Sequence, residues 1–90
     1  MNELVKYLAT NYYPGGNAVR IVKVSELLDE SDFTIDQVFD WAMEARNAGI
    51  LEVMRAHVKD GRWGVDAMIP EDLEFIAVTH KTVQYVREHN

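Results

Sequence analysis

Near the start of the chain, apolar side chains recur at the three- and four-residue intervals of an amphipathic helix. The positions are Leu4, Val5, Leu8 and Tyr12. Asn2 stands where an N-cap is expected, and Pro14 ends the segment because proline cannot continue a helix. We therefore expect a first helix that ends before the Pro-Gly-Gly turn at 14–16.

The period of the pattern changes at 19–24, where VRIVKV alternates and is rich in β-branched residues. This predicts a short strand with Arg20 and Lys23 facing solvent. Ser25 is then expected to cap a short helix, ELLDES, whose Leu27 and Leu28 point inward.

The most specific local signal is the start of the next helix. Thr34 and Gln37 have the spacing of a capping box, in which each side chain bonds the other residue's backbone amide. Phe33 and Val38 occupy the two positions of a hydrophobic staple across that cap. Gly49 suits the position after the helix. The apolar face of this predicted helix carries Val38, Ala42 and Ala45.

A β-hairpin is predicted from ILEVMRAHVK and RWGVDAMI, which flank Asp60-Gly61, the strongest two-residue turn signal. With that dipeptide as the loop, the cross-strand pairs include Met54 with Ala67 and Arg55 with Asp66. Because side chains alternate along a strand, one face is then apolar and the other is basic. The basic face carries Arg55, His57, Lys59 and Arg62.

The tail after Pro70 has acids at its start and basic residues toward its end, which suits the dipole of a helix over 71–90. Its β-branched middle, FIAVTH, is also compatible with a strand, but the charge polarity favours a helix. Such a helix is apolar on more than one side and so needs a second partner. The residues expected at that protein interface are Phe75, Val78, Tyr85 and Val86.

This order of elements resembles a winged helix-turn-helix domain. The residues that carry the resemblance are VSELLDESDFTIDQVFDWAMEARNAGILEV at 24–53 and the AHVKDGRWGV hairpin at 56–65. The resemblance implies an α+β, mainly helical fold of helix, strand, helix, helix and hairpin wing over 1–70. The extra helix at 71–90 is then the expected dimerisation element.

In winged helices the capped helix enters the major groove and the wing touches phosphates. The resemblance therefore implies a DNA-binding transcriptional regulator that acts as a homodimer on double-stranded DNA, with the wing supplying phosphate contacts. The residues expected at the nucleic acid are Arg20, Thr34, Gln37, Arg55, His57, Lys59 and Arg62. Thr34 and Gln37 have an alternative role as helix caps only, and the wing charges one as a solvated hairpin tip.

Charge complicates this expectation, because the chain has a net charge of −6. Three of the groove-facing positions implied by the resemblance are Asp36, Asp40 and Glu44, which would approach phosphates. The alternative is an acidic winged-helix module that binds a basic protein through this helix, with Phe39 and Met43 as contacts. An acidic antagonist that imitates DNA ranks below both.

Enzymatic chemistry is not indicated. The chain has no cysteine, its three histidines show no ligand spacing, and no glycine-rich phosphate loop precedes a helix. We therefore expect no catalytic residues, metal or cofactor. No apolar run is long enough to span a bilayer and no signal peptide is evident, so we expect a cytoplasmic protein with no membrane partner.

Overall fold

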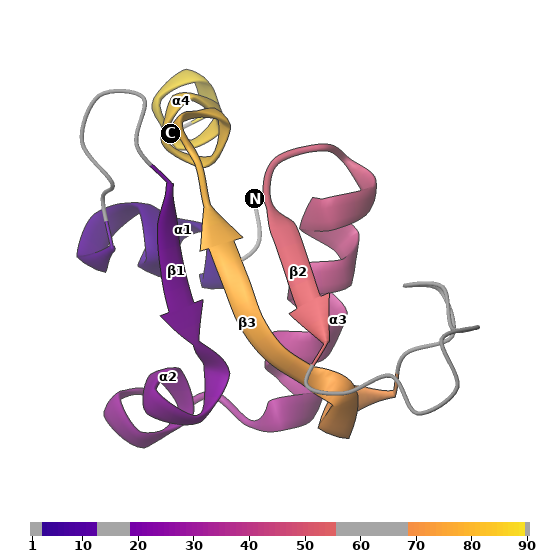
Figure 1. Ribbon diagram of the computed structural model, residues 1–90. Helices are drawn as coiled ribbons and strands as arrows, with labels where there is room; N and C mark the ends of the chain where they lie inside the picture. Colours follow the sequence, from indigo (N-terminus) through magenta and orange to yellow (C-terminus); the bar gives the residue numbers. More distant parts are fainter. Residues whose placement is uncertain (1–2, 13–18, 56–68, 90) are drawn as a thin grey trace.

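The computed structural model describes residues 3–12, 19–55 and 69–89 (Figure 1). Its helices among these residues are α1 (Glu3–Asn11), α2 (Val24–Glu30), α3 (Ile35–Asn47), the 3₁₀ turn η2 (Pro70–Asp72) and α4 (His80–His89). Its strands are β1 (Arg20–Lys23), β2 (Glu52–Arg55) and β3 (Leu73–Val78). The described fold is thus α+β and mainly helical, as the sequence predicts.

The three strands form one antiparallel sheet in the order β1-β3-β2, so the last strand in sequence lies in the middle. Cα partners across the sheet define three successive rows. They are Ile21–Ala77–Glu52, Val22–Ile76–Val53 and Lys23–Phe75–Met54. Directly paired residues share a face and neighbouring rows alternate, so the middle row faces opposite to the other two.

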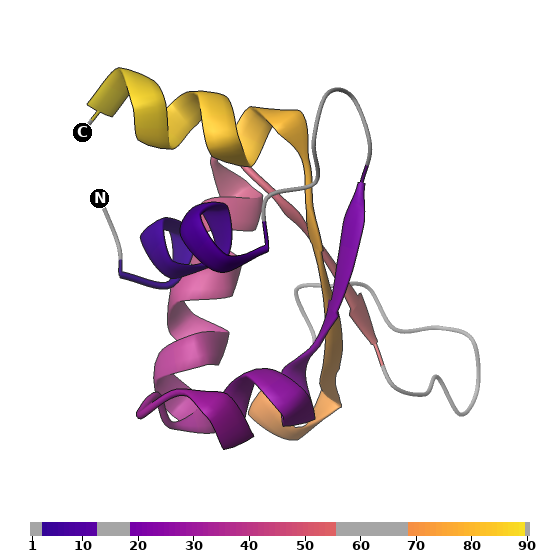
Figure 2. The same ribbon diagram turned by 90° about the vertical axis from the view of Figure 1, so that its left-hand side faces the viewer.

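Helices cover only the face of the sheet that carries the middle row, which we call the inner face (Figure 2). Figure 2 shows α1, α2 and α3 on that side, with α4 crossing beside α1. The core lies between these layers. Its most completely buried side chains include Leu4, Leu8, Leu27, Val38, Leu51, Ile76 and Val78.

The local predictions for the first half of the chain agree with the structure. α1, β1 and α3 form where the patterns place them, and Val38, Ala42 and Ala45 are buried on α3. Gly49 adopts a φ of 76°, the left-handed conformation that suits the residue after a helix. The Ser25 cap is wrong, because α2 already begins at Val24 with Lys23 at its N-cap.

The strand that pairs with β2 among the described residues is not the one that the hairpin prediction names. Met54 pairs with Phe75 and Arg55 with Leu73 of β3, whereas their predicted partners, Ala67 and Asp66, lie outside the described residues. The Asp60-Gly61 dipeptide favours a tight turn only locally, whereas LEFIAV supplies the apolar strand that the sheet core needs. The predicted turn itself lies outside the described residues.

The prediction of one helix over 71–90 is also wrong in its first half. Residues Leu73–Val78 form β3, and α4 begins only at His80. The β-branched character of this stretch outweighs the helix-like charge polarity, because the position between β1 and β2 buries Ile76 and Val78 completely.

Candidate functional site

The capping box at the start of α3 is present as predicted. The backbone amide of Gln37 donates to Thr34 Oγ1 at 3.2 Å, and the Thr34 amide donates to Gln37 Oε1 at 3.0 Å. Both side-chain oxygens are therefore used within the protein. The cap role of Thr34 and Gln37 is confirmed, whereas their contact with nucleic acid stays a prediction.

The exposed side of α3 is acidic. Asp36, Asp40 and Glu44 are all exposed, and their four-residue spacing places them in one stripe along the helix. Arg46 is the only basic residue of α3, and its guanidinium donates to Asn47 Oδ1 at 2.9 Å. The helix thus presents a negative stripe to solvent.

The negative charge of the chain is concentrated in the segment from α2 to α3. Residues 24–47 contain seven acids and one arginine, a net charge of −6, which equals the net charge of all 90 residues. The remaining residues are therefore neutral in sum. All seven acids are exposed, and we call them the acidic surface: Glu26, Asp29, Glu30, Asp32, Asp36, Asp40 and Glu44.

Phe39 and Met43, the expected apolar contacts on α3, are half-buried and pack against the core. Each keeps part of its surface at the edge of the helix. They are therefore brought next to the acidic stripe, as the sequence predicts, but with less area available than a fully exposed side chain offers.

The expected basic residues are not assembled by the part of the chain that the structure describes. Arg20 is exposed at the start of β1, at the opposite end of that strand from α2, and its Cζ lies 5.6 Å from the centre of the Tyr12 ring. Arg55 ends β2. His57, Lys59 and Arg62 lie outside the described residues.

The four residues expected at a C-terminal interface separate into two groups. Val78 is completely buried in the core, so it is not available to a second chain. Tyr85 and Val86 are half-buried and pack against the same core, and the Tyr85 ring stacks on His89 with centroids 4.1 Å apart. Phe75 is half-buried and lies on the sheet face opposite to the inner face.

A row of aromatic rings joins α1 to α3, which the sequence patterns did not reveal. Phe33 makes edge-to-face contacts with Tyr7 at 5.5 Å and with Trp41 at 5.3 Å between centroids. The Tyr7 hydroxyl also donates to Glu30 Oε1 at 3.3 Å. Desolvation raises the pKa of Tyr7 above its usual value, and the charge and hydrogen bond of Glu30 raise it further.

Two surface hollows accompany these features. One, of about 230 Å³, lies at the start of α4 and is lined by Val19, Gly49, Leu51, Glu52, Thr79, His80 and Lys81. The other lies along α1 and is lined by Glu3, Lys6, Tyr7, Thr10, Asn11 and Phe33. Within 3–12, 19–55 and 69–89, no three metal-ligating side chains gather, and no helix is long and apolar enough to cross a membrane.

The chain matches no protein-family model, no curated protein and no solved structure.

Proposed function

We propose that this chain is a winged-helix protein that uses its acidic surface to bind a basic protein partner. The winged-helix assignment is supported by the order of the elements, in which α1, β1, α2, α3, β2 and β3 follow one another. It is also supported by the antiparallel pairing of β2 with β3 and by the packing of the capped α3 against β2. In this class of fold, α3 is the helix that meets the ligand.

The observation that carries the partner assignment is the concentration of the whole net charge in residues 24–47. Like charges four residues apart on a helix cost about 0.2–0.5 kcal/mol per pair. The stripe of Asp36, Asp40 and Glu44 therefore weakens α3 slightly in the free chain. A cationic surface docked on the stripe removes this repulsion and gains attraction, and Phe39 and Met43 add apolar contact at its edge.

The same stripe opposes insertion of α3 into DNA. A carboxylate can accept from the amino group of cytosine, but each acid also faces two phosphate-lined strands. Charges within about 8 Å of each other are little screened at physiological salt. The side-chain oxygens of Thr34 and Gln37 are both hydrogen-bonded within the cap of α3. The helix therefore offers little to attract a polyanion.

A second candidate function is favoured by the element order itself. The chain would be a homodimeric transcriptional regulator that binds double-stranded DNA through basic residues of β1, of β2 and of the β2–β3 connection. Its contacts would be Arg20, Arg55, His57, Lys59 and Arg62, and α3 would contribute discrimination more than attraction. Neutralising phosphates in this way gives a steep salt dependence.

A peptide titration separates the two functions. The probe is a helical peptide of about 20 residues rich in lysine and arginine, long enough to lie along α3, which spans 13 residues. We expect the wild type to bind it, and Asp36→Asn/Asp40→Asn/Glu44→Gln to bind at least about tenfold more weakly.

The matched control removes three exposed acids elsewhere, Glu3→Gln/Glu71→Gln/Glu88→Gln, with the same change of net charge. It should bind the peptide as the wild type does. Absence of peptide binding, or equal loss in both triple variants, excludes the acidic surface as the site. Binding of mixed duplex DNA at low salt that disappears in Lys59→Glu/Arg62→Glu instead establishes the second candidate.

A further inference from the structure

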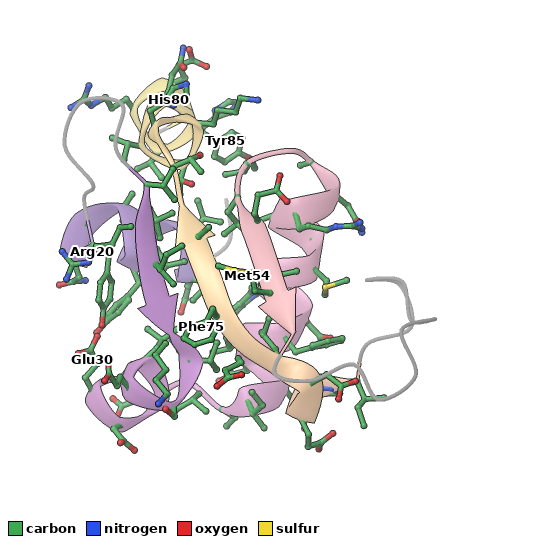
Figure 3. The ribbon with its side chains drawn as sticks, in the orientation of Figure 1. Arg20, Glu30, Met54, Phe75, His80 and Tyr85 are labelled. Atoms are coloured by element: carbon green, nitrogen blue, oxygen red, sulfur yellow. The ribbon has the colours of Figure 1, made fainter. Side chains whose placement is uncertain are left out.

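The face of the sheet that the helices leave open, which we call the outer face, is apolar. It carries the rows Ile21–Ala77–Glu52 and Lys23–Phe75–Met54. Ile21 keeps 49% and Met54 37% of its surface exposed, and Phe75 lies half-buried between β1 and β2 (Figure 3). Val19, two residues before Ile21, is 56% exposed. Ala77, in the row between Ile21 and Glu52, is buried. Large apolar side chains that stay exposed together on one sheet face are typical of an association surface.

The charges of the outer face stand at opposite corners. Lys23 is at the end of one row on β1, and Glu52 is at the end of the other row on β2. Strand spacing and rise place their Cα atoms about 12 Å apart in one chain. Both are exposed, and neither has an ion-pair partner among the described residues. The face is therefore positive at one corner and negative at the other.

This arrangement is complementary to itself. Two copies can be stacked with their outer faces about 10 Å apart. A two-fold axis then lies midway between the faces and runs parallel to the diagonal from Ile21 to Met54. Rotation about this axis brings Lys23 of each copy over Glu52 of the other, so two ion pairs form. Phe75, which is half-buried, lies near the middle of this contact. The strands cross steeply, close to the orthogonal class of sheet packing.

We propose that this chain forms a two-fold dimer through its outer face, with Lys23 of each copy paired to Glu52 of the other. The partner at this face is a second copy because one face supplies both the positive corner and the negative corner that a two-fold contact pairs. The dimer does not use α4, whose Tyr85 and Val86 already pack on the core. It is also independent of the acidic surface, which belongs to α2, α3 and the turn between them.

Association through this face is weak, since three short strands present less area than the roughly 800 Å² per partner of standard interfaces. Sedimentation equilibrium from about 1 µM to about 1 mM covers the corresponding range of dissociation constants. We expect the wild-type mass to rise with concentration from the 10.3 kDa of one chain toward twice that value.

Ile21→Lys should remain monomeric at every concentration, because it places two like charges at the axis. Ile69→Lys is the matched control, since Ile69 is an isoleucine of similar exposure, 52%, outside both rows of the outer face. It should dimerise as the wild type does. A wild type that stays monomeric overturns the proposal and leaves the outer face to a different protein. Equal behaviour of the two variants also overturns it.

A charge exchange tests the pairing itself. Lys23→Glu and Glu52→Lys should each raise the dissociation constant at least about tenfold, because each places like charges opposite one another twice. The double exchange should return it to within about threefold of wild type. Lys6→Glu, an exposed reversal on α1, controls for net charge and should change little. A double variant as weak as the single variants contradicts the geometry.

Discussion

The two faces of one small sheet differ in what their side chains do. On the inner face, Val22, Ile76 and Val53 are at most 9% exposed and lie under three helices. On the outer face, Ile21 and Met54, one row away, keep about a third to a half of their surface. Both faces are apolar, so composition alone does not distinguish them. The inner face is therefore buried by folding itself, whereas the outer face keeps the exposed area that the proposed dimer would use.

The largest expected effect comes from truncating the same residue type on each face. Ile76→Ala removes a completely buried side chain from the central strand and should lower the free energy of unfolding by about 2–5 kcal/mol. Ile21→Ala removes a half-exposed one and should cost less than about 1 kcal/mol. Urea unfolding at about 1 µM, a concentration at which we expect the monomer, measures both. Similar losses of free energy of unfolding at the two positions would show that the two faces contribute equally to the stability of the fold.

The second effect concerns a polar group on the covered side. Thr82 is completely buried, its hydroxyl donates to the Ile50 carbonyl at 2.7 Å, and it accepts from the Thr79 amide at 3.1 Å. This one side chain ties the first turn of α4 to the chain that enters β2. Thr82→Val should cost about 1–3 kcal/mol, because a buried carbonyl and an amide both lose their partner.

The control for Thr82 is Thr10→Val. The Thr10 hydroxyl also donates to a backbone carbonyl, that of Lys6 at 2.8 Å, but it lies exposed on α1 where water can replace it. A change within about 0.5 kcal/mol is expected there. Thermal unfolding of the two variants compares them directly. If Thr82→Val lowers the free energy of unfolding no more than Thr10→Val does, burial does not increase the contribution of the Thr82 hydrogen bonds to stability.

The elements that could be predicted from the sequence are those specified by neighbouring residues. Three such features form as predicted: the capping box of Thr34 and Gln37, the apolar stripe of α3, and the helix end at Gly49. The residues that specify each feature are close together in the sequence. The strand β1 was likewise evident from its alternation. Local chemistry dominates at α3 because the hydrogen bonds of its cap close within one helical turn.

The elements that could not be predicted depend on partners far along the chain. β3 is a strand because it pairs with β1, and Val22 is separated from Ile76 by more than fifty residues. The outer face needs the same register before Ile21, Phe75 and Met54 can be recognised as neighbours. The Tyr7–Phe33 contact similarly joins α1 to the residue before α3. The acidity of α3, by contrast, was evident from the sequence, and its exposure is confirmed.

A smaller effect is expected from the cap of the helix that covers the inner face. Thr34→Ala removes the acceptor for the Gln37 amide without touching any core side chain, and it should cost about 1 kcal/mol. Thr34→Ser keeps the hydroxyl and should retain most of the stability. Denaturant midpoints at constant slope give the comparison. An alanine variant as stable as the serine variant would mean that α3 is held on the sheet by its apolar face alone.

The smallest effect is a pH dependence at the rim of the helical side, where Tyr7 of α1 bonds Glu30 of α2. The pKa of Tyr7 is raised, first by desolvation and then by the charge and hydrogen bond of Glu30. Below about pH 10 the phenol is neutral in the folded and unfolded chains alike. As the pH rises further, the unfolded chain releases the proton first, so the free energy of unfolding falls.

Tyr7→Phe removes this titration, so the wild type should lose stability faster than the variant as the pH rises above about 10. Glu30→Gln keeps an acceptor but removes the charge, and its slope should lie between the two. Chemical unfolding at matched ionic strength gives all three slopes, and subtraction cancels the other groups that titrate there. Parallel slopes for wild type and Tyr7→Phe would mean that solvent fully screens the interaction between Tyr7 and Glu30. The burial that distinguishes the helical side from the outer face would then not extend from the core to this rim.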